Sequence, residues 1–347
     1  MRISLLGIAL VASAVSFGLP ASAQEPKPIS ISYQPAIYGL GIEIATQQGW
    51  WKEIGLEPTF TMFPSGAPQI AAAAAGAWDV GLLGAPPAVL GAVRMQLKTI
   101  ALATEEGNAN VVLARADEVE AIKADPSSLK GKPFLVSTNS TGEYASWACL
   151  SKLGLNRKDM QFINLAPAQI VSAFSNGEGA LAGTFTPFVY TIQQQTGAKV
   201  LCSAADADKF LMSVIVTRPD YADENKEAVA KFLATYLRAI AWIKGNEDKA
   251  LEALQAFYSK NGVVIDVEYM RQEMTKDRQQ FTLDKQIETF ARSDNASTLD
   301  QAFDDFMGYL TETGTIPEKL DPKTFITNEY LQMIDSDPAL KAWAMNQ

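Results

Sequence analysis

The sequence predicts an α/β protein with two lobes, and two matching segments indicate this most directly. IAAAAAGAWDVGLLGAPPAV and VSAFSNGEGALAGTFTPFVY each show a small-residue helix, a glycine, a short apolar strand and a proline. The spacing agrees, because 76–86 and 177–187 both run from that glycine to that proline over ten positions. Helices commonly end at glycine and begin with proline, so each segment is one α/β unit. The length of 347 residues also exceeds what one hydrophobic core usually supports.

The first 23 residues have the pattern of a secretory signal peptide. Arg2 precedes an apolar run that ends at Pro20, and Ala21-Ser22-Ala23 matches the small-residue pattern of a cleavage site. We expect cleavage near Ala23 and a product that acts outside the cytoplasm. An uncleaved anchor helix is the alternative, which the short apolar run disfavours.

Composition argues against several classes of function. The chain holds 39 acidic and 29 basic residues, a formal net charge of −10, which disfavours nucleic acid and anionic membranes as partners. Histidine is absent, which removes the Ser-His-Asp and Cys-His catalytic groupings and the commonest zinc ligand. The sequence has neither a glycine-rich phosphate loop nor a carboxylate-rich calcium loop. We therefore expect no metal and no cofactor.

The first lobe is predicted from apolar patterns and from the glycine and proline residues at element ends. In chain order, its elements are a strand at 29–33, a helix that ends at Gly49, a strand at 56–63, a helix opened by 65–68 and a strand at 80–83. This alternation of strands and helices predicts a parallel sheet. Two further strands, at 100–104 and 111–114, are expected to lead out of the lobe.

After a polar crossover at 117–132, a second series of strands and helices predicts the other lobe. Its elements are a strand at 134–138, a helix at 141–153, a strand at 160–165, a helix that ends at Gly177, and strands at 181–184 and 199–202. An apolar strand at 213–217 and a run of helices from Glu224 predict a return to the first lobe. We therefore expect lobe one at 24–115 and 217–347, lobe two at 116–216, and a hinge made of the two crossings.

The chain has two cysteines, Cys149 and Cys202, which fall in the same predicted lobe. An oxidising compartment permits a disulfide between them. Two buried free thiols are the alternative, because the sequence does not supply the Cα separation that decides whether a bridge can form.

Several motifs together resemble one family of binding proteins. Beside the two α/β units, the chain contains TQQGWWKEIGLEPTF, SLKGKPFLVSTNSTGEYASWACLSKLGL and GYLTETGTIPEKLDPKTFITNEYL, in an order that covers nearly all of the mature protein. This order and spacing resemble the nitrate, taurine and aliphatic-sulfonate solute-binding proteins of ABC importers, a group related to the thiamine-pyrimidine-synthase-like proteins. The resemblance implies a type II periplasmic-binding fold, a ligand cleft between the lobes, a periplasmic location and delivery to a permease.

The second α/β unit departs from the family pattern. The family commonly has an acid three positions after the glycine, as Asp79 does in the first unit, but Ala180 stands there. Where the family usually has tryptophan and an acid before the proline, this chain has Phe185 and Thr186. We expect Phe185 to wall the cleft and Thr186 to cap a helix or turn its hydroxyl to the ligand. The resemblance therefore does not fix the ligand.

Candidate ligand contacts in the first lobe lie where strands end, because open α/β sheets bind ligands beyond the carboxyl ends of their strands. Tyr38 and Gly39 stand at the turn into the first helix, where backbone N–H groups and the helix dipole favour an anion. Gly84 and Ala85 repeat this arrangement after the third strand. The alternatives are that Tyr38 packs on the lobe surface and that Gly84 only relieves crowding.

The second lobe offers matching contacts at the start of a helix. Ser140, Thr141 and Gly142 supply hydroxyl and amide donors for a sulfonate, nitrate or carboxylate group. Glu143 completes a capping-box pattern with Ser140, in which each side chain bonds the other residue's backbone N–H. A structural role therefore competes with ligand binding at Glu143.

Glu105, Glu106 and Asn108 follow a strand that approaches the hinge. Neighbouring side chains of an extended backbone point to opposite faces, so at most one of the two carboxylates faces the cleft. Glu106, with Asn108 beside it, is the candidate ligand contact, and solvated loop charges are the alternative that stays open. No Arg or Lys falls at a predicted strand end, which favours a zwitterion or a cation over a simple anion.

These observations favour a non-catalytic solute receptor that works with the transmembrane subunits of an ABC permease. The preferred ligand is a small zwitterion or anion, above all a taurine-like aminosulfonate with its ammonium near Glu106 or Glu143. A small guanidine-like cation is the alternative ligand. A pyrimidine-synthase-like enzyme is the alternative function, disfavoured because the resemblance implies that such chemistry uses a histidine and a cysteine-rich motif. We expect a monomer that binds no nucleic acid.

Overall fold

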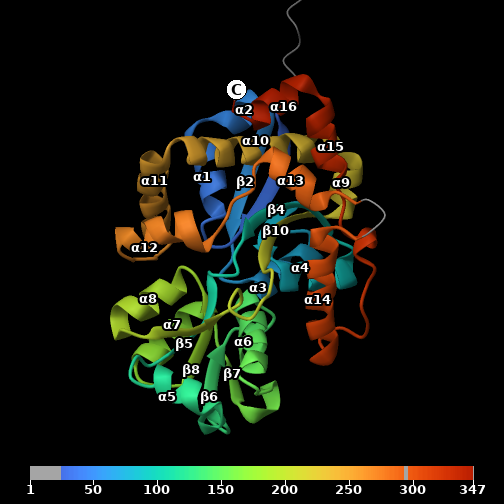
Figure 1. Ribbon diagram of the computed structural model, residues 1–347. Coiled ribbons are helices and arrows are strands. Elements are labelled where there is room, and N and C mark those ends of the chain that lie inside the picture. The colour runs from blue at the N-terminus through green and yellow to red at the C-terminus, as the bar shows by residue number, and fades with distance from the viewer. Residues whose placement is uncertain (1–24, 293–295, 347) are drawn as a thin grey trace, which may run out of the picture.

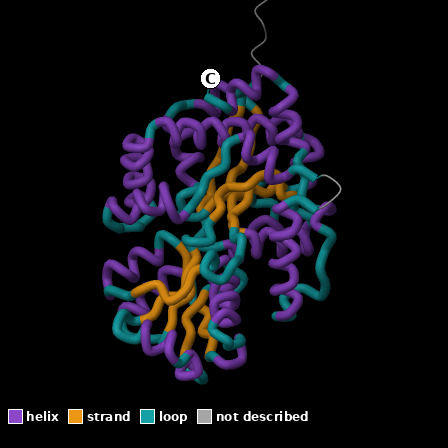
Figure 2. The backbone as a smooth tube through the Cα atoms, in the orientation of Figure 1, coloured by secondary structure: helices purple, strands orange, loops and turns teal. Residues whose placement is uncertain are grey.

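The computed structural model describes residues 25–292 and 296–346 and shows two lobes, one above the other (Figure 1). Each lobe is built on a five-stranded sheet with helices on the outside (Figure 2). The two-lobed α/β fold expected from the sequence is therefore confirmed. The expected signal peptide, 1–23, lies outside the described residues. Within them, none of the helices is long and apolar enough to span a membrane.

The two sheets have the same plan. The first has the order β2-β1-β3-β10-β4 and the second the order β7-β6-β8-β5-β9. β1 runs parallel to β2 and β3, as predicted, and β6 runs parallel to β7 and β8. The strands are β1 (Lys27–Tyr33), β2 (Leu56–Met62), β3 (Val80–Gly84), β4 (Lys98–Glu105), β5 (Asn110–Ala114), β6 (Pro133–Val136), β7 (Gln161–Asn164), β8 (Leu181–Phe185), β9 (Lys199–Ser203) and β10 (Met212–Thr217).

The lobe boundaries differ from the expected ones. The expected boundaries place β5 in lobe one and most of β10 in lobe two, but β5 pairs with β8 and β9, and β10 pairs with β3 and β4. Each sheet thus takes up an antiparallel strand directly after the chain crosses from the other lobe. The apolar pattern that predicts such a strand is the same in either sheet, and only the pairing partners decide to which sheet it belongs.

Helices cover the sheets and extend lobe one at its C-terminal end. α10 packs against α1, α15 and α16, while α14 reaches down from lobe one beside α6 (Figure 1). The helices are α1 (Gly39–Gln47), α2 (Trp50–Glu53), α3 (Gly66–Ala74), α4 (Ala85–Met95), α5 (Val119–Ala124), α6 (Thr141–Lys152), α7 (Pro167–Ser175), α8 (Phe188–Thr196), α9 (Pro219–Glu224), α10 (Lys226–Gly245), α11 (Glu247–Lys260), α12 (Val267–Gln272), α13 (Leu283–Phe290), α14 (Thr298–Glu312), α15 (Glu329–Ser336) and α16 (Pro338–Ala344).

The central strands are apolar on both faces because helices cover both sides of each sheet. β3, β5, β8 and β10 are buried at every position. Continuous apolar strands of this kind are typical of sheets with helices on both faces. The cores hold each sheet rigid and so fix the strand ends that face the other lobe.

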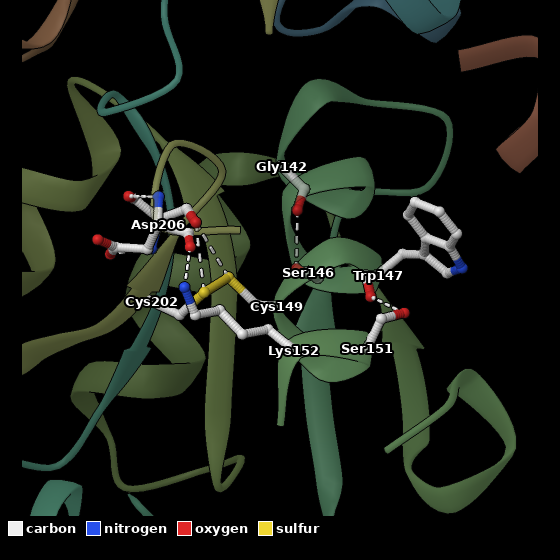
Figure 3. The surroundings of a disulfide bond; sticks show 9 residues. Gly142, Ser146, Trp147, Cys149, Ser151, Lys152, Cys202 and Asp206 are labelled. Carbon is white, nitrogen blue, oxygen red and sulfur yellow. Dashed lines mark hydrogen bonds between the residues drawn. A yellow bond between two sulfur atoms is a disulfide. The ribbon is translucent and has the colours of Figure 1, made fainter. Parts of the chain in front are cut away.

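A disulfide joins Cys149 of α6 to Cys202 of β9, with the two Cα atoms 5.9 Å apart (Figure 3). The structure thus decides between the two alternatives that the sequence leaves open. Lys152, one turn further along α6, donates to the carbonyl of Asp206, so a polar contact lies beside the bridge. Both contacts anchor α6, the helix whose first turn faces lobe one.

Replacing both cysteines, Cys149→Ala with Cys202→Ala, is expected to lower the free energy of unfolding of lobe two by about 4 kcal/mol. The chain-entropy relation predicts this loss for a closed loop of about 54 residues. Urea unfolding of the double variant and the oxidised wild type measures the difference. Equal unfolding free energies would show that the bridge does not constrain the unfolded chain.

Candidate functional site

A small cavity lies between the lobes, where the strand ends of the two sheets face each other. Its volume is about 20 Å³, close to the size of one water molecule, so a larger ligand enters only when the lobes separate. The lining comes from both lobes: Gln34, Tyr38, Gly66, Gly84, Pro87, Glu106, Ser213 and Arg278 from lobe one, and Ser140, Thr141 and Phe185 from lobe two.

Three helix N-termini meet at one side of this cavity. α3 begins at Gly66, α4 follows Gly84, and α6 begins at Thr141. The three starts are in contact, because a Cβ on Gly84 would lie 2.5 Å from Cγ2 of Thr141 and one on Gly66 would lie 2.4 Å from Cγ of Pro87. First-turn N–H groups have no partner within their helix, and the helix dipole is positive there. This side of the cavity favours a negative group.

The start of α6 is held by its own cap. Ser140 Oγ accepts from the Glu143 N–H at 3.2 Å, as the capping-box pattern predicts. The other half of the pattern is wrong, because Glu143 accepts from the Asn139 N–H at 2.7 Å instead of from Ser140. Glu143 also forms an ion pair with Arg157. These contacts hold the Glu143 carboxylate away from the cavity.

Glu106 is the acidic group of the cavity and is almost completely buried. Its Oε2 accepts from Arg278, from the Ser213 hydroxyl at 2.9 Å and from the Thr104 hydroxyl at 3.3 Å. Oε2 accepts all three of these bonds, and Oε1 accepts none of them. Glu105 turns the other way and accepts from the Gly107 N–H at 2.8 Å, so one of the two carboxylates faces the cleft, as expected.

Arg278 reaches Glu106 through a backbone contact with β4. Glu105 and Gln279 exchange two backbone hydrogen bonds of 2.8 and 2.9 Å, which places the neighbouring Arg278 beside Glu106, 172 positions earlier. A cationic side chain therefore lines the cleft, although no Arg or Lys falls at a predicted strand end. Reasoning from strand ends does not reach Arg278, because this residue follows the π-helical turn Glu273–Asp277 after α12.

The Arg278 guanidinium also bonds across the cleft to lobe two. Nε donates to the Thr186 hydroxyl at 3.0 Å, and Nη2 donates to the Thr186 carbonyl at 3.2 Å. Thr186 does not cap α8, whose N-cap is Pro187 without a side-chain bond, so the expected cap is wrong. The peptide bond between Thr186 and Pro187 is cis. Thr186 thus serves as lobe two's contact to the charged groups of lobe one.

Glu273 is the second carboxylate beside Arg278, at 3.3 Å from Nε. It is fully buried and accepts from the Thr186 hydroxyl at 2.6 Å and the Tyr258 hydroxyl at 2.7 Å. Burial raises the pKa of Glu273 despite the neighbouring guanidinium, which lowers it. The Tyr38 ring lies 5.8 Å from the guanidinium carbon, within range of a cation–π contact, and burial raises the pKa of the Tyr38 hydroxyl.

Two rims of interlobe contacts flank the cavity. On one side, the Tyr190 ring of α8 stacks on Tyr269 of α12 with centroids 4.9 Å apart, and its hydroxyl donates to Asp277. On the other side, α6 meets α14: Tyr144 lies 4.4 Å from Phe306, measured between ring centroids. The two rims hold the lobes together on both sides of the cavity.

The structure distributes the predicted contact residues in three ways. Lining the cavity are Tyr38, Gly84, Glu106, Ser140, Thr141 and Phe185. Behind the lining are Gly39, Ala85, Gly142 and Thr186. Outside it are Glu143, which is paired with Arg157, and Asn108, which is exposed, so neither lines this cavity and their ligand contacts stay predictions.

Sequence reasoning missed several lining residues. These are Gln34, Gly66, Pro87, Ser213 and Arg278, with Glu273 behind them. Gly66 could have been predicted from the sequence, because it stands at the start of the helix after β2 as Gly84 does after β3. Arg278 and Glu273 had none, since they belong to the C-terminal helical part of the chain. Across the described residues, no group of three His, Cys, Asp or Glu side chains is placed to hold a metal ion.

A family model described as NMT1/THI5 like matches residues 37–250, more than half of the chain. This chain belongs to the NMT1/THI5-like family. The chain is similar to the taurine-binding periplasmic protein of Escherichia coli. The two are 28% identical over 192 residues, which are 54% of this chain and 58% of the relative.

Solved structures share the fold of this NMT1/THI5-like protein. The periplasmic aliphatic sulphonate binding protein SsuA of Escherichia coli has a TM-score of 0.70 at 20% identity, over 87% of this chain and 92% of SsuA. The periplasmic nitrate-binding protein NrtA of Synechocystis PCC 6803 has a TM-score of 0.68 at 14% identity, over 92% of this chain and 91% of NrtA. At these identities the likeness shows the two-lobed binding-protein fold.

Gly84→Ala is expected to hold the lobes of this NMT1/THI5-like protein apart. The backbone of Gly84, with φ of −66°, accepts alanine, but the new Cβ would lie 2.5 Å from Cγ2 of Thr141 in the other lobe. Small-angle scattering should therefore give a larger radius of gyration than for the wild type. Adding Thr141→Ser removes Cγ2 and should restore the wild-type value; an unchanged radius in Gly84→Ala would contradict the contact.

Glu273→Gln is expected to remove a pH dependence of stability. Because the folded-state pKa of Glu273 is raised, the folded protein holds this proton longer than the unfolded chain does. The wild type should therefore lose stability as the pH rises above the ordinary glutamate pKa of about 4.3, whereas Glu273→Gln should not.

Urea unfolding between acidic and neutral pH measures this difference. The exposed Glu178→Gln is the matched control and should follow the wild type. Parallel pH profiles for Glu273→Gln and the wild type would contradict the raised pKa.

Proposed function

We propose that this protein is a non-catalytic receptor that captures a small zwitterion, of the taurine type, between its lobes. One observation carries the proposal: the same cavity is lined by residues at three helix N-termini and by Glu106. Taurine carries a sulfonate and an ammonium group two carbons apart. Its sulfonate suits the N–H groups of the helix starts, and its ammonium suits Oε1 of Glu106.

The charges at the cleft favour a zwitterion over ions of one sign. A simple anion meets the buried Glu106 and Glu273 without a free cationic side chain, because Arg278 is already bonded to both. A simple cation meets the positive ends of α3, α4 and α6. A ligand with both charges avoids either repulsion.

The comparisons support a transport role without choosing the ligand. The taurine-binding relative agrees with an aminosulfonate and SsuA with an aliphatic sulfonate, whereas NrtA is a nitrate-binding protein of the same fold. The choice therefore rests on Glu106 and the helix starts. As a receptor of this kind, the protein is proposed to lose its signal peptide, act in the periplasm as a monomer, and deliver its ligand to the membrane subunits of an ABC permease. Without histidine, it offers no imidazole for the synthase-type chemistry.

Calorimetric titration of the mature protein tests the ligand class. Taurine should bind more tightly than ethanesulfonate, which lacks the amine, and than ethylammonium, which lacks the sulfonate. Glu106→Gln should weaken taurine binding by roughly 10- to 100-fold, since a hydrogen bond to a charged group contributes about 1.5–3 kcal/mol.

Two controls make this result specific. Glu105→Gln keeps the acceptor for the Gly107 N–H and should bind taurine like the wild type. Ethanesulfonate affinity should not fall in Glu106→Gln, because that ligand has no group for the carboxylate. If Glu106→Gln binds taurine unchanged, or if ethanesulfonate matches taurine in the wild type, the zwitterion proposal is wrong.

A further inference from the structure

Arg278 is bonded as a free guanidinium ligand would be. The side chain is 1% exposed, and its three nitrogens donate to Glu106, to Thr104 Oγ1 at 3.4 Å, and to both oxygens of Thr186. Glu273 supplies a second carboxylate at 3.3 Å, and the Tyr38 ring lies within cation–π range. Two carboxylates, a carbonyl and an aromatic ring are the groups that recognise a small organic cation.

The parts of this cation site come from segments far apart in the chain. Glu106 lies after β4, Thr186 lies in lobe two, and Glu273 lies one π-helical turn before Arg278. Arg278 therefore fills a site whose other walls are formed by residues at the ends of β4, β10 and β8. Without the guanidinium, Glu106 and Glu273 would be two buried carboxylates that share one unfilled space.

We propose that Arg278 sets the charge selectivity of the cleft, because its guanidinium occupies the cation site between Glu106 and Glu273. The intact cleft then accepts a ligand with both charges and rejects a free guanidinium ion. The part of this inference that concerns the zwitterion rests on the proposed function. The part that concerns the cation site does not. It assigns to Arg278 the role of a specificity-determining residue.

A second cavity supports an experiment on the truncated side chain. Arg278 lines both the interlobe cavity and a hollow of about 630 Å³ on lobe one, together with Ile243, Met274 and Phe281. Because Arg278 lines both spaces, we expect Arg278→Ala to connect them and to let a small cation reach Glu106 and Glu273 from the surface. N-Ethylguanidinium is the probe, because it replaces the atoms that the substitution removes beyond Cβ.

Titration with N-ethylguanidinium measures the predicted change of selectivity. Arg278→Ala should bind it at least about 100-fold more tightly than the wild type, and the melting temperature of the variant should rise with its concentration. Arg278→Met, which removes the charge but fills the space, is the matched control and should not gain this binding. An equal concentration of sodium chloride should not raise the melting temperature of Arg278→Ala as the probe does.

The result separates selectivity from a structural role. If Arg278 only supports the fold, the substitution lowers binding of every ligand together and N-ethylguanidinium restores nothing, which overturns the proposal. Wild-type protein that binds N-ethylguanidinium as tightly as Arg278→Ala also overturns it. Should Arg278→Ala not fold, Arg278→Ala with Glu273→Gln keeps the space and one carboxylate, and the same gain of binding is expected. Taurine binding by the wild type is measured in a separate titration. A failure of the zwitterion proposal can therefore be distinguished from a failure of the proposal for Arg278.

Discussion

A buried guanidinium has to be surrounded by acceptors, and this constraint organises the centre of the molecule. Removing a charge from water costs several kcal/mol unless counter-charges and hydrogen bonds offset it. Arg278 receives them from Glu106, Glu273 and Thr186. Because Thr186 belongs to lobe two, the same bonds that satisfy the charge also join the lobes. The hydrogen bonds that stabilise the buried charge of lobe one therefore also stabilise the closed cleft.

Closure is shared between this polar centre and two apolar rims. The rims, α8 against α12 and α6 against α14, bring aromatic side chains together at ring separations of 4.9 and 4.4 Å. A ligand larger than water has to part these contacts and then replace them with its own. The free energy of its binding is therefore the free energy of its own contacts minus that of the interlobe contacts it replaces. How far the ligand shifts the protein between open and closed forms depends on how much more tightly it binds one form than the other.

Local signals predicted much of the fold and part of the site. The glycine and proline residues of the two α/β units marked the strand ends, so Gly84, Ser140 and Thr141 were found, because chain direction alone places these residues at the inner edge of a parallel sheet. Glu106 was found from strand alternation. The differences between expectation and structure have two causes. β5 and β10 fall in the sheet opposite to the expected one, because strand pairing joins segments far apart in the sequence. Glu143 points away from the cavity because of nearer groups, the Asn139 N–H and Arg157, whose contacts form only when the first turn of α6 has its folded geometry.

The sequence by itself determined the α/β units, the parallel cores of the two lobes and the family, because these depend on local periodicity and on the backbone limits of glycine and proline. Only the tertiary structure decided which sheet each crossing strand joins, that Cys149 and Cys202 are bonded, and that Arg278 enters the cleft. The reason is that a pair of backbone hydrogen bonds between Glu105 and Gln279 carries no signal in either segment. Two positions that far apart in the sequence are neighbours only in the folded lobe.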